Sequence, residues 1–358
     1  MELPVIKVSG SSYEVGYQHG SKAKKQISVI IDVYKNMFRE FSDIDWDTAK
    51  KIALKFERSI SNFNNDYLDE IKGIADGSGY EYEEILALNV RSEIVFQGTY
   101  CTSDGCTSIA VTSEKTETST TYLGQNWDWK VKTLEGIILL KIKKEGKPAI
   151  ATMTEAGIVG KIGCNSNGIG VCFNALSVDA TPEGVPIHII LRNILEQPTF
   201  LKAMSVVSNT QMGCPGNILL ASQYGEALDF EIEIDDFEGL YPINGIIIHT
   251  NHYISLKLPK GVHRDMAKRK FPDTFIRYGR ADKLIRAVNG HITKNDMKMI
   301  FTDHSDSSVS ICHHENNMEI GGDGIGSVFS IIMDLKAKEF YVSFGQPCKN
   351  EFKKYIVN

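Results

Sequence analysis

The first third of the chain carries apolar side chains at helical spacing. Small and aromatic residues between Tyr13 and Gly20 share one helix face, and an apolar stripe continues over residues 27–34. Residues three and four positions apart lie on the same side of a helix, so this pattern predicts amphipathic helices over most of residues 10–95. Further helical segments are predicted at 45–60, 67–75 and 82–90, after a short strand at 4–8.

Beyond Cys106 the pattern changes to short β-branched or apolar runs between glycine, asparagine or charged turns, which is typical of strands. Strands are predicted at 107–111, 121–124, 136–143, 149–154, 168–174, 217–222, 227–234, 245–250, 327–333 and 339–344. Helices are predicted between them at 185–197, 199–207, 274–288 and 294–301. Because no internal repeat or proline-rich linker divides the chain, we expect one domain, residues 1–358, with helices outside two strand sets.

The composition is that of an ordinary soluble protein, with 358 residues of which 42% are hydrophobic and 23% charged. A net charge of −6 argues against a nucleic-acid partner. The N-terminus has no basic region followed by an apolar stretch, and no window approaches the ~20 apolar residues of a membrane span, so we expect no membrane partner and a cytoplasmic location. Seven cysteines at irregular spacing predict reduced, mostly buried thiols.

Cys106, which follows Gly105, is the first candidate for chemistry. A free thiol has a pKa of roughly 8.5 and needs a base to become a nucleophile. One source of that base is a histidine, and His249 or His252, with Asn251 as orienter, are the candidates. The other is the α-amino group of Cys106, with a reference pKa of about 7.7–8.0, which requires a cut at the Gly105–Cys106 bond. A buried structural cysteine at a strand start is the competing interpretation.

Two polar residues further along the chain are also candidates. Asp128 stands between Trp127 and Trp129 at a predicted strand end, where aromatic walls lower the local dielectric and strengthen the hold of a carboxylate on an amine. Asn251 follows a predicted strand, and its amide N–H is suited to a developing oxyanion. The alternatives are that the tryptophans are core residues and that Asn251 is part of a polar strand end.

The run from Ser310 to His314 invites a metal interpretation because it contains adjacent histidines, His313 and His314. Consecutive strand residues point to opposite faces, however, and neither a CxxC nor an HExxH spacing accompanies the pair. We therefore expect no metal and no cofactor. His19, alone on the first predicted helix, is expected to be a structural residue.

Six runs match, in order, motifs of a known family. They are residues 13–20 (YEVGYQHG), 104–107 (DGCT), 124–128 (GQNWD), 154–157 (TEAG), 249–252 (HTNH) and 310–312 (SIC). The chain resembles the isopenicillin-N acyltransferase family, which comprises acyl-CoA:6-aminopenicillanate acyltransferases and related self-processing amide hydrolases of the N-terminal-nucleophile class. The runs span nearly the whole chain and are jointly far more specific than any one alone, so they favour the functional interpretation of Cys106.

This resemblance implies a four-layer αββα sandwich of the α+β class, made as an inactive precursor. The precursor would be cut between Gly105 and Cys106 into an alpha chain, 1–105, and a beta chain, 106–358, that stay associated.

The resemblance also implies a role for each matching residue. By position, Cys106 is the nucleophile and its own amine the base, Asp128 orients that amine, Asn251 lines the oxyanion hole and Ser310 supports the site. Two departures bear on acyl or amine specificity rather than on the nucleophile. The family often has arginine directly after the Ser-Ile-Cys run, where this chain has His313, and a serine expected shortly before residue 216 is absent.

We therefore expect a self-cleaving cysteine amidohydrolase or acyltransferase that acts on a linear amide or an acyl thioester such as an acyl-CoA. Two alternatives stay open on the sequence. One is a hydrolase that uses no acyl-CoA, and the other is a non-catalytic binding module on the same fold.

Overall fold

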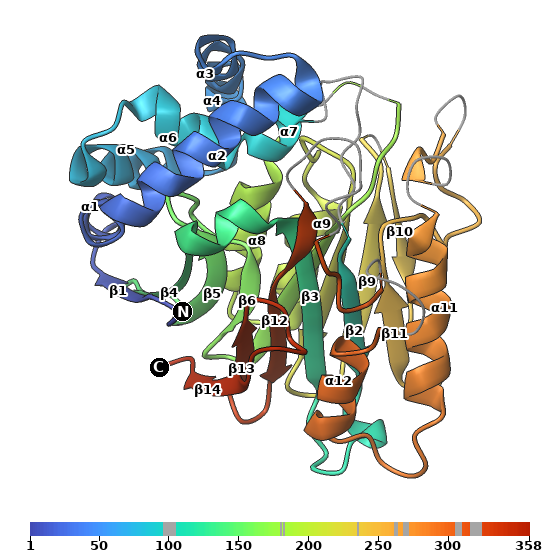
Figure 1. Cartoon of the computed structure of the whole chain (residues 1–358). Coiled ribbons are helices and arrows are strands. Elements are labelled where there is room, and N and C mark those ends of the chain that lie inside the picture. The colour runs from blue at the N-terminus through green and yellow to red at the C-terminus, as the bar shows by residue number, and fades with distance from the viewer. Residues whose placement is uncertain are drawn as a thin grey trace.

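Two β-sheets stacked between layers of helices form the centre of the protein (Figure 1). This computed structural model describes residues 1–95, 105–179, 181, 183–234, 236–260, 264–267, 272–304, 310–315 and 324–358. Asp104 of the predicted motif lies outside the described residues.

Within the described residues, the larger sheet has eight strands and the smaller has six. The larger sheet has the order β1 (Val5–Ser9), β4 (Ile137–Lys143), β5 (Ile150–Glu155), β6 (Ile162–Asn165), β7 (Ile169–Ala175), β8 (Gly216–Ser222), β9 (Ala227–Ile232), β10 (Phe237–Leu240). The smaller sheet has the order β11 (Ile246–His249), β2 (Thr107–Val111), β3 (Tyr122–Lys130), β12 (Ile325–Asp334), β13 (Glu339–Phe344), β14 (Phe352–Ile356). β1 and β4 are parallel, and every other pair of neighbouring strands in these two orders is antiparallel.

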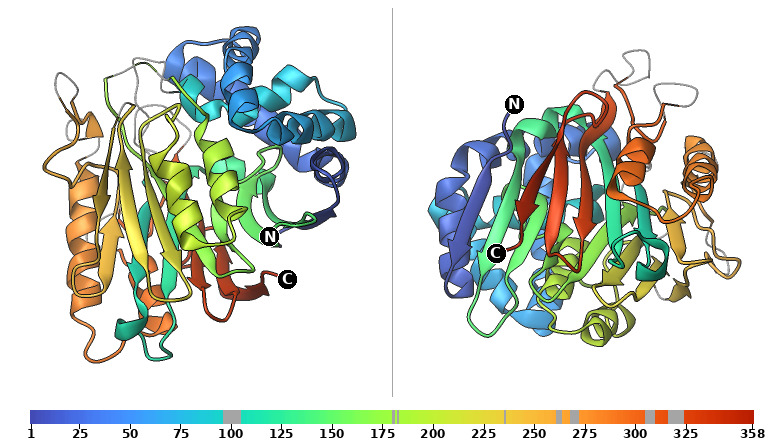
Figure 2. Two further views of the ribbon diagram at one scale, coloured as in Figure 1. Left: turned by 180° about the vertical axis from the view of Figure 1, so that it is seen from behind. Right: turned by 90° about the horizontal axis from the view of Figure 1, so that it is seen from below.

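Helices cover the outer face of each sheet (Figure 2). α8 (Ile187–Leu195) and α9 (Phe200–Ser208) pack on the larger sheet, and α11 (Asp273–Arg286) and α12 (Lys294–Phe301) pack on the smaller one. This is the predicted four-layer αββα sandwich of the α+β class, and the prediction is confirmed. None of the helices in the described ranges is both long and apolar enough to cross a membrane.

The N-terminal helices form a separate group beside the sandwich, at the upper left of Figure 1. They are α1 (Ser12–Lys22), α2 (Lys24–Ser42), α3 (Trp46–Leu54), α4 (Glu57–Asn64), α5 (Asp66–Ser78), α6 (Tyr82–Asn89) and α7 (Arg91–Val95). Their apolar faces join a hydrophobic cluster that also contains residues of both sheets. The mainly helical character predicted for residues 10–95 is confirmed.

The predicted strands agree with the structure except where periodicity is weak. The strands at 107–111 and 339–344 match to the residue, but the strand predicted at 121–124 continues to Lys130, so Asp128 lies inside β3 and not at its end. The strands β6, β10 and β14 were not predicted. β10 and β14 are edge strands with half-exposed or exposed side chains, so they show little of the apolar alternation that marks a strand.

Helices α1 and α5 cross with their backbones in direct contact. A Cβ atom added to Gly16 would lie 2.0 Å from the carbonyl oxygen of Glu70, and one added to Gly20 would lie 2.2 Å from a carbonyl oxygen of α5. Gly73 and Gly77 of α5 meet carbonyl oxygens of α1 at 2.2 Å in the same way. Because no larger side chain fits, the four glycines set the distance between the two helices.

Replacing Gly16 by alanine should lower the free energy of unfolding by about 1–3 kcal/mol, because the methyl group overlaps the Glu70 carbonyl and forces the helices apart. The matched control is Gly279→Ala on α11, where an added Cβ meets nothing within 4 Å and helix propensity favours alanine by about 1 kcal/mol. Urea unfolding should give a lower midpoint for Gly16→Ala and an equal or higher one for Gly279→Ala. Equal midpoints for the two variants would contradict this account.

His19 of α1 is fully buried, and its Nε2 accepts a hydrogen bond from the Gly157 N–H at 3.1 Å. Burial, followed by the positive charge of Arg192, lowers the pKa of His19 to about 3. The ring is therefore neutral at neutral pH, and the contact with Gly157 joins α1 to the turn after β5. These contacts support the structural role predicted for His19.

The low pKa of His19 makes stability depend on pH. Below pH 6.5 an unfolded histidine takes up a proton that folded His19 does not take up until about pH 3, so this residue destabilises the fold as the pH falls through that window. Between about pH 7.5 and about pH 4.5 the loss amounts to about 2–3 kcal/mol. In His19→Gln, which keeps an acceptor for Gly157, the measured loss of unfolding free energy should be smaller by that amount. The exposed control His291→Gln should follow the parent protein, and an unchanged slope in His19→Gln would refute the assignment.

Candidate active site

Cys106 lies directly before β2, which is hydrogen-bonded to a strand on each side. Thr107 pairs with Asn126 of β3, and Ser108 pairs with His249 of β11. Both ladders are antiparallel, so the chain before Thr107 runs alongside the chain that follows each of these partners. The residues just past Asn126 and His249 are therefore brought to the start of β2.

Continuing the two registers places Asp128 opposite Gly105 and Asn251 opposite Cys106. The structure agrees for the first pair, because a Cβ atom added to Gly105 would lie 2.8 Å from Oδ2 of Asp128 and 3.0 Å from Nδ1 of His313. Both Cys106 and Asp128 are fully buried. The carboxylate of Asp128 thus lies against Gly105, the residue before Cys106, where a larger side chain would clash.

Asp128 is held in place by the neighbouring strand β12. Ser327 donates a hydrogen bond from Oγ to Asp128 Oδ1 at 2.6 Å, beside a register shift between Ser327 and Phe329. The same Ser327 Oγ accepts the His313 N–H at 3.0 Å, and the Ser327 N–H donates to the His313 carbonyl at 3.0 Å. Ser327 therefore fixes both the carboxylate and the segment that carries His313.

Arg277 of α11 lies on the outer side of the smaller sheet. It links the residue before β2, Cys106, to Asn251, which follows β11. Its Nη1 donates to the Cys106 carbonyl at 2.7 Å and to Thr107 Oγ1 at 3.3 Å, while Nη2 donates to Asn251 Oδ1 at 3.0 Å. Its Nε donates to Asp273 at 2.9 Å. Arg277 was not predicted from the sequence, because a charged residue on an amphipathic helix is usually solvent-exposed and this one is buried.

Asn251 is oriented by three contacts. Its side-chain oxygen accepts from Arg277, its Nδ2 donates to the Ala175 carbonyl of β7 at 3.1 Å, and its backbone N–H donates to Thr274 Oγ1 at 2.8 Å. An amide nitrogen carries two hydrogens. With the oxygen fixed by Arg277, Nδ2 uses one hydrogen on Ala175 and has a second to donate.

The two histidines considered as bases for Cys106 have other partners. Nε2 of His249 lies 2.8 Å from Glu231 Oε1 and its Nδ1 lies 2.8 Å from the Thr250 carbonyl. Burial alone would lower the pKa of His249, but the nearby acidic side chains raise it above its ordinary value. Nδ1 of His252 lies 2.9 Å from Thr274 Oγ1. Both ring nitrogens of His249 and Nδ1 of His252 are thus engaged away from Cys106.

Trp127 and Trp129 do not form the aromatic walls expected around Asp128, and that expectation was wrong. Successive residues of β3 alternate between faces, so Trp127 and Trp129 lie on the face opposite the carboxylate. The Lys161 ammonium lies 3.2 Å from the Trp127 ring centre, and the Arg91 guanidinium lies 5.2 Å from that of Trp129. Trp127 instead belongs to the same apolar cluster as Cys106.

A cluster of buried charges lies near Trp127 and Trp129. Its central residue is Glu155, which belongs to the Thr-Glu-Ala-Gly run at 154–157. Glu155 contacts Arg91 Nε at 3.1 Å and Lys161 Nζ at 3.0 Å, and it accepts from the Tyr34 hydroxyl at 2.6 Å. Burial alone would raise the pKa of Glu155, but the charges of Arg91 and Lys161 hold it well below its ordinary value. This cluster joins the N-terminal helices to the larger sheet.

Ser310 begins a buried segment that runs beside Asp128. The neighbouring Ile311 carbonyl accepts from Asn126 Nδ2 at 2.7 Å, which attaches the segment to β3. Nδ1 of His313 lies 3.9 Å from Asp128 Oδ2. Burial, followed by the charge of Arg277, lowers the pKa of His313 to about 4, so the residue at the position where the family often has arginine is neutral.

The fold and this site define an αββα sandwich in which side chains from adjacent strands converge on the residue before β2. A model of the family described as acyl-coenzyme A:6-aminopenicillanic acid acyl-transferase matches residues 115–349. The acyl-coenzyme A:6-aminopenicillanic-acid-acyltransferase 40 kDa form of Emericella nidulans is 31% identical over 345 residues, which cover 96% of this chain and 92% of that protein. The chain belongs to this acyltransferase family, as its motifs predicted, and is an enzyme of acyl transfer or amide hydrolysis.

Solved structures with remote likeness include two hydrolases. A variant of conjugated bile acid hydrolase from Clostridium perfringens aligns with a TM-score of 0.49 at 12% identity, over 71% of this chain and 97% of that one. Penicillin V acylase from Agrobacterium tumefaciens aligns with a TM-score of 0.40 at 11% identity, over 67% of this chain and 83% of that one. The fold assignment rests on the layers and sheet orders described above.

Arg277→Lys should lower kcat/KM about 100-fold, because a single ammonium cannot hold both the Cys106 carbonyl and the Asn251 oxygen, and a displacement of about 1 Å has a cost of that order. The matched control is Arg286→Lys on the same helix, where the guanidinium pairs with Asp282 at the surface. Arg286→Lys should unfold near the parent midpoint, and Arg277→Lys should unfold at a lower midpoint but remain folded under the assay conditions. Full activity in Arg277→Lys would show that this residue does not position the site.

Proposed function

We propose that this enzyme cuts itself at the Gly105–Cys106 bond and then uses Cys106 to carry the acyl group of its substrate. The observation that carries the proposal is that separate elements place polar groups at this bond: Asp128 of β3 lies beside Gly105, and Arg277 of α11 donates to the Cys106 carbonyl and to the side chain of Asn251. The products of the cut would be an alpha chain, 1–105, and a beta chain, 106–358, which stay associated.

The cut proceeds as an N-to-S acyl shift followed by hydrolysis. The Cys106 sulfur attacks the Gly105 carbonyl carbon, the C–N bond breaks, and the nitrogen takes up a proton to become the α-amino group. Water then hydrolyses the thioester, which leaves a carboxylate on Gly105 and restores the thiol. Gly105 suits this step because it lies against Asp128 and His313 where a Cβ atom would clash.

The base for turnover is the new α-amino group of Cys106. Its reference pKa of about 7.7–8.0 suits it to accept the thiol proton near neutral pH. Asp128, which lies beside Gly105 and is fixed by Ser327, orients the amine in this proposal. This assignment is supported by the engagement of His249 with Glu231 and Thr250, which leaves no free ring nitrogen on that histidine.

The remaining groups act on the substrate carbonyl. The second Nδ2 hydrogen of Asn251 stabilises the developing oxyanion, while Arg277 fixes the amide through its oxygen. Ser310 supports the site from the segment next to Asp128. The acyl group leaves its amine or thiol, is held on the Cys106 sulfur, and passes to water or to an amine.

The substrate class we propose is a linear amide or an acyl thioester such as an acyl-CoA. The relative from Emericella nidulans is named for acyl-coenzyme A and 6-aminopenicillanic acid. This chain departs from the family pattern at His313, Cys214 and Pro215. We therefore propose that it shares the acyl-transfer chemistry of the family, and we do not propose a penicillin nucleus as its substrate.

Intact-mass measurement and a panel of amides and thioesters test the proposal together. The purified enzyme should give two chains whose boundary is Gly105–Cys106, and Cys106→Ala should give one uncut chain with turnover reduced by at least about 10⁴-fold. Assays with and without an amine acceptor separate the two reactions, since a pure hydrolase yields free acid alone.

The control variant is Cys164→Ala, which removes a different buried cysteine. Cys164 lies in β6 of the larger sheet, whereas Cys106 precedes β2 of the smaller one. It should be cut and should turn over substrate like the parent enzyme. Full turnover in Cys106→Ala would overturn the mechanism. A single uncut and inactive parent chain would instead favour a binding module on this fold.

A further inference from the structure

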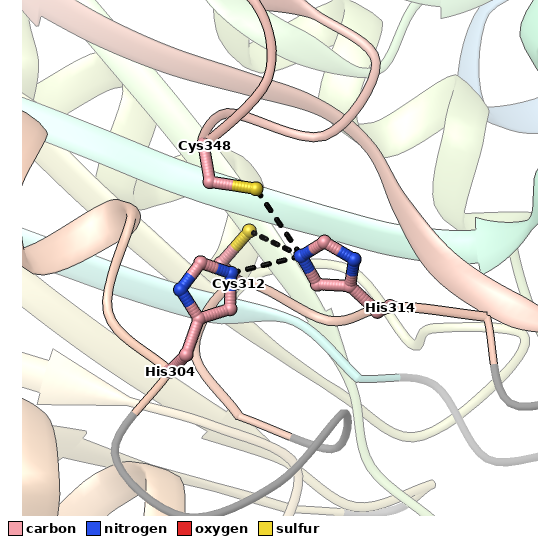
Figure 3. Close-up of side chains that lie close together, drawn as sticks. All are labelled: His304, Cys312, His314 and Cys348. Atoms are coloured by element: carbon pink, nitrogen blue, oxygen red, sulfur yellow. Dashed lines mark hydrogen bonds between the residues drawn. The ribbon is translucent and has the colours of Figure 1, made fainter.

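Four metal-ligating side chains converge at a place that the proposed mechanism does not use (Figure 3). His304 follows α12, Cys312 and His314 belong to the segment 310–315, and Cys348 lies in the turn after β13. Their ligand atoms all lie within 4.8 Å of one another. The end of α12, the segment 310–315 and the turn after β13 therefore supply two sulfurs and two imidazoles to one point.

Hydrogen bonding alone does not account for this arrangement. Nε2 of His314 lies 2.8 Å from His304 Nε2, 3.2 Å from Cys348 Sγ and 3.6 Å from Cys312 Sγ. A ring nitrogen has a single hydrogen-bonding position, as a donor or as an acceptor, so it cannot satisfy three partners at once. A cation placed among the four atoms interacts favourably with all of them.

We propose that His304, Cys312, His314 and Cys348 bind a zinc ion. Two thiolates and two neutral imidazoles form one of the usual tetrahedral sets of structural zinc sites, and two thiolates neutralise the charge of the ion. With four protein ligands the coordination is closed, so the site is structural and leaves no position for a substrate.

The spacing of the ligand atoms fits this assignment. Zn–N bonds of about 2.0–2.1 Å and Zn–S bonds of about 2.3 Å give tetrahedral edges of about 3.3–3.8 Å between ligand atoms. The three separations from His314 Nε2 are 2.8, 3.2 and 3.6 Å and all four ligand atoms lie within 4.8 Å of one another, so shifts of up to about 1 Å complete the tetrahedron.

The segment 310–315 is not a strand, and for this reason the cluster was not predicted from the sequence. The sequence pattern pairs His313 with His314, whereas the structure brings His314 together with Cys312, two residues before it. His313 turns the other way, toward Asp128. His304 lies ten residues before His314 and Cys348 lies 34 residues after it, and this spacing is neither the CxxC nor the HExxH pattern that marks a metal site in a sequence.

The ion would fix one wall of the candidate active site. The Cys312 N–H already donates to the Asp303 carbonyl at 3.0 Å, and Arg280 holds the Asp303 carboxylate through two hydrogen bonds of 2.8 and 3.0 Å. A zinc ion would also join the turn after β13, through Cys348, to the segment 310–315. It would thus anchor the segment 310–315 from one side, and this segment carries His313, whose Nδ1 lies 3.9 Å from Asp128 Oδ2.

Zinc content tests the site without any assay of activity. Protein reduced, loaded with Zn²⁺ and freed of excess metal should retain one ion per chain by elemental mass spectrometry. Cys348→Ser and His304→Ala should each weaken zinc binding by at least about 100-fold, since the loss of even an outer-shell partner costs about 10–100-fold. Co²⁺ loaded in place of zinc should give the ligand-field absorption of a tetrahedral thiolate site in the parent only.

Two controls make the result specific. Cys106→Ala and His291→Ala remove a cysteine and a histidine outside the cluster, and both should keep the full zinc content. The proposal is overturned if the reduced parent retains no zinc, if Cys348→Ser retains as much as the parent, or if zinc is lost in Cys106→Ala. A Cys312–Cys348 disulfide that re-forms in the presence of Zn²⁺ would also overturn it. None of these outcomes depends on whether Cys106 is the nucleophile.

Discussion

Backbone hydrogen bonds hold β2 between β3 and β11, and the candidate site follows from this pairing. The two antiparallel registers deliver Asp128 and Asn251 to the residues just before Thr107. A slip of one residue in either ladder would turn the delivered side chain to the other face of the sheet. The apolar clusters on the two faces of the smaller sheet oppose such a slip, so the packing of the sandwich protects the geometry around Cys106.

Buried charges near the site occur in contact with opposite charges or with hydrogen-bond acceptors. Arg277 joins Asp273, Asn251 and the Cys106 carbonyl, and Glu155 joins Arg91 and Lys161 on the far side of β3. Removing one member of such a set leaves a partner buried without its contacts, which is costly. These networks therefore tie α11, the N-terminal helices and both sheets to one arrangement of the site.

The sequence was most informative where the chemistry is local. The helix at 294–301 and the strands at 107–111 and 339–344 have clear periodicity and were predicted to the residue. The six ordered motifs were sufficient to predict the family and the αββα layers. The end of β3 was predicted too early, because its polar residues face buried partners on other elements and so break the apolar pattern.

The sequence by itself determined most of the succession of helices and strands, the family and the candidates Cys106, Asp128, Asn251 and Ser310, because these depend on local periodicity and on ordered motifs. Only the tertiary structure decided which side chains meet. It placed Arg277 against the Cys106 carbonyl, turned the tryptophans away from Asp128, and gathered His304, Cys312, His314 and Cys348. The physical reason is that such arrangements depend on which face of a strand each side chain takes and on how the sheets and helices pack, and neither is set by local periodicity alone.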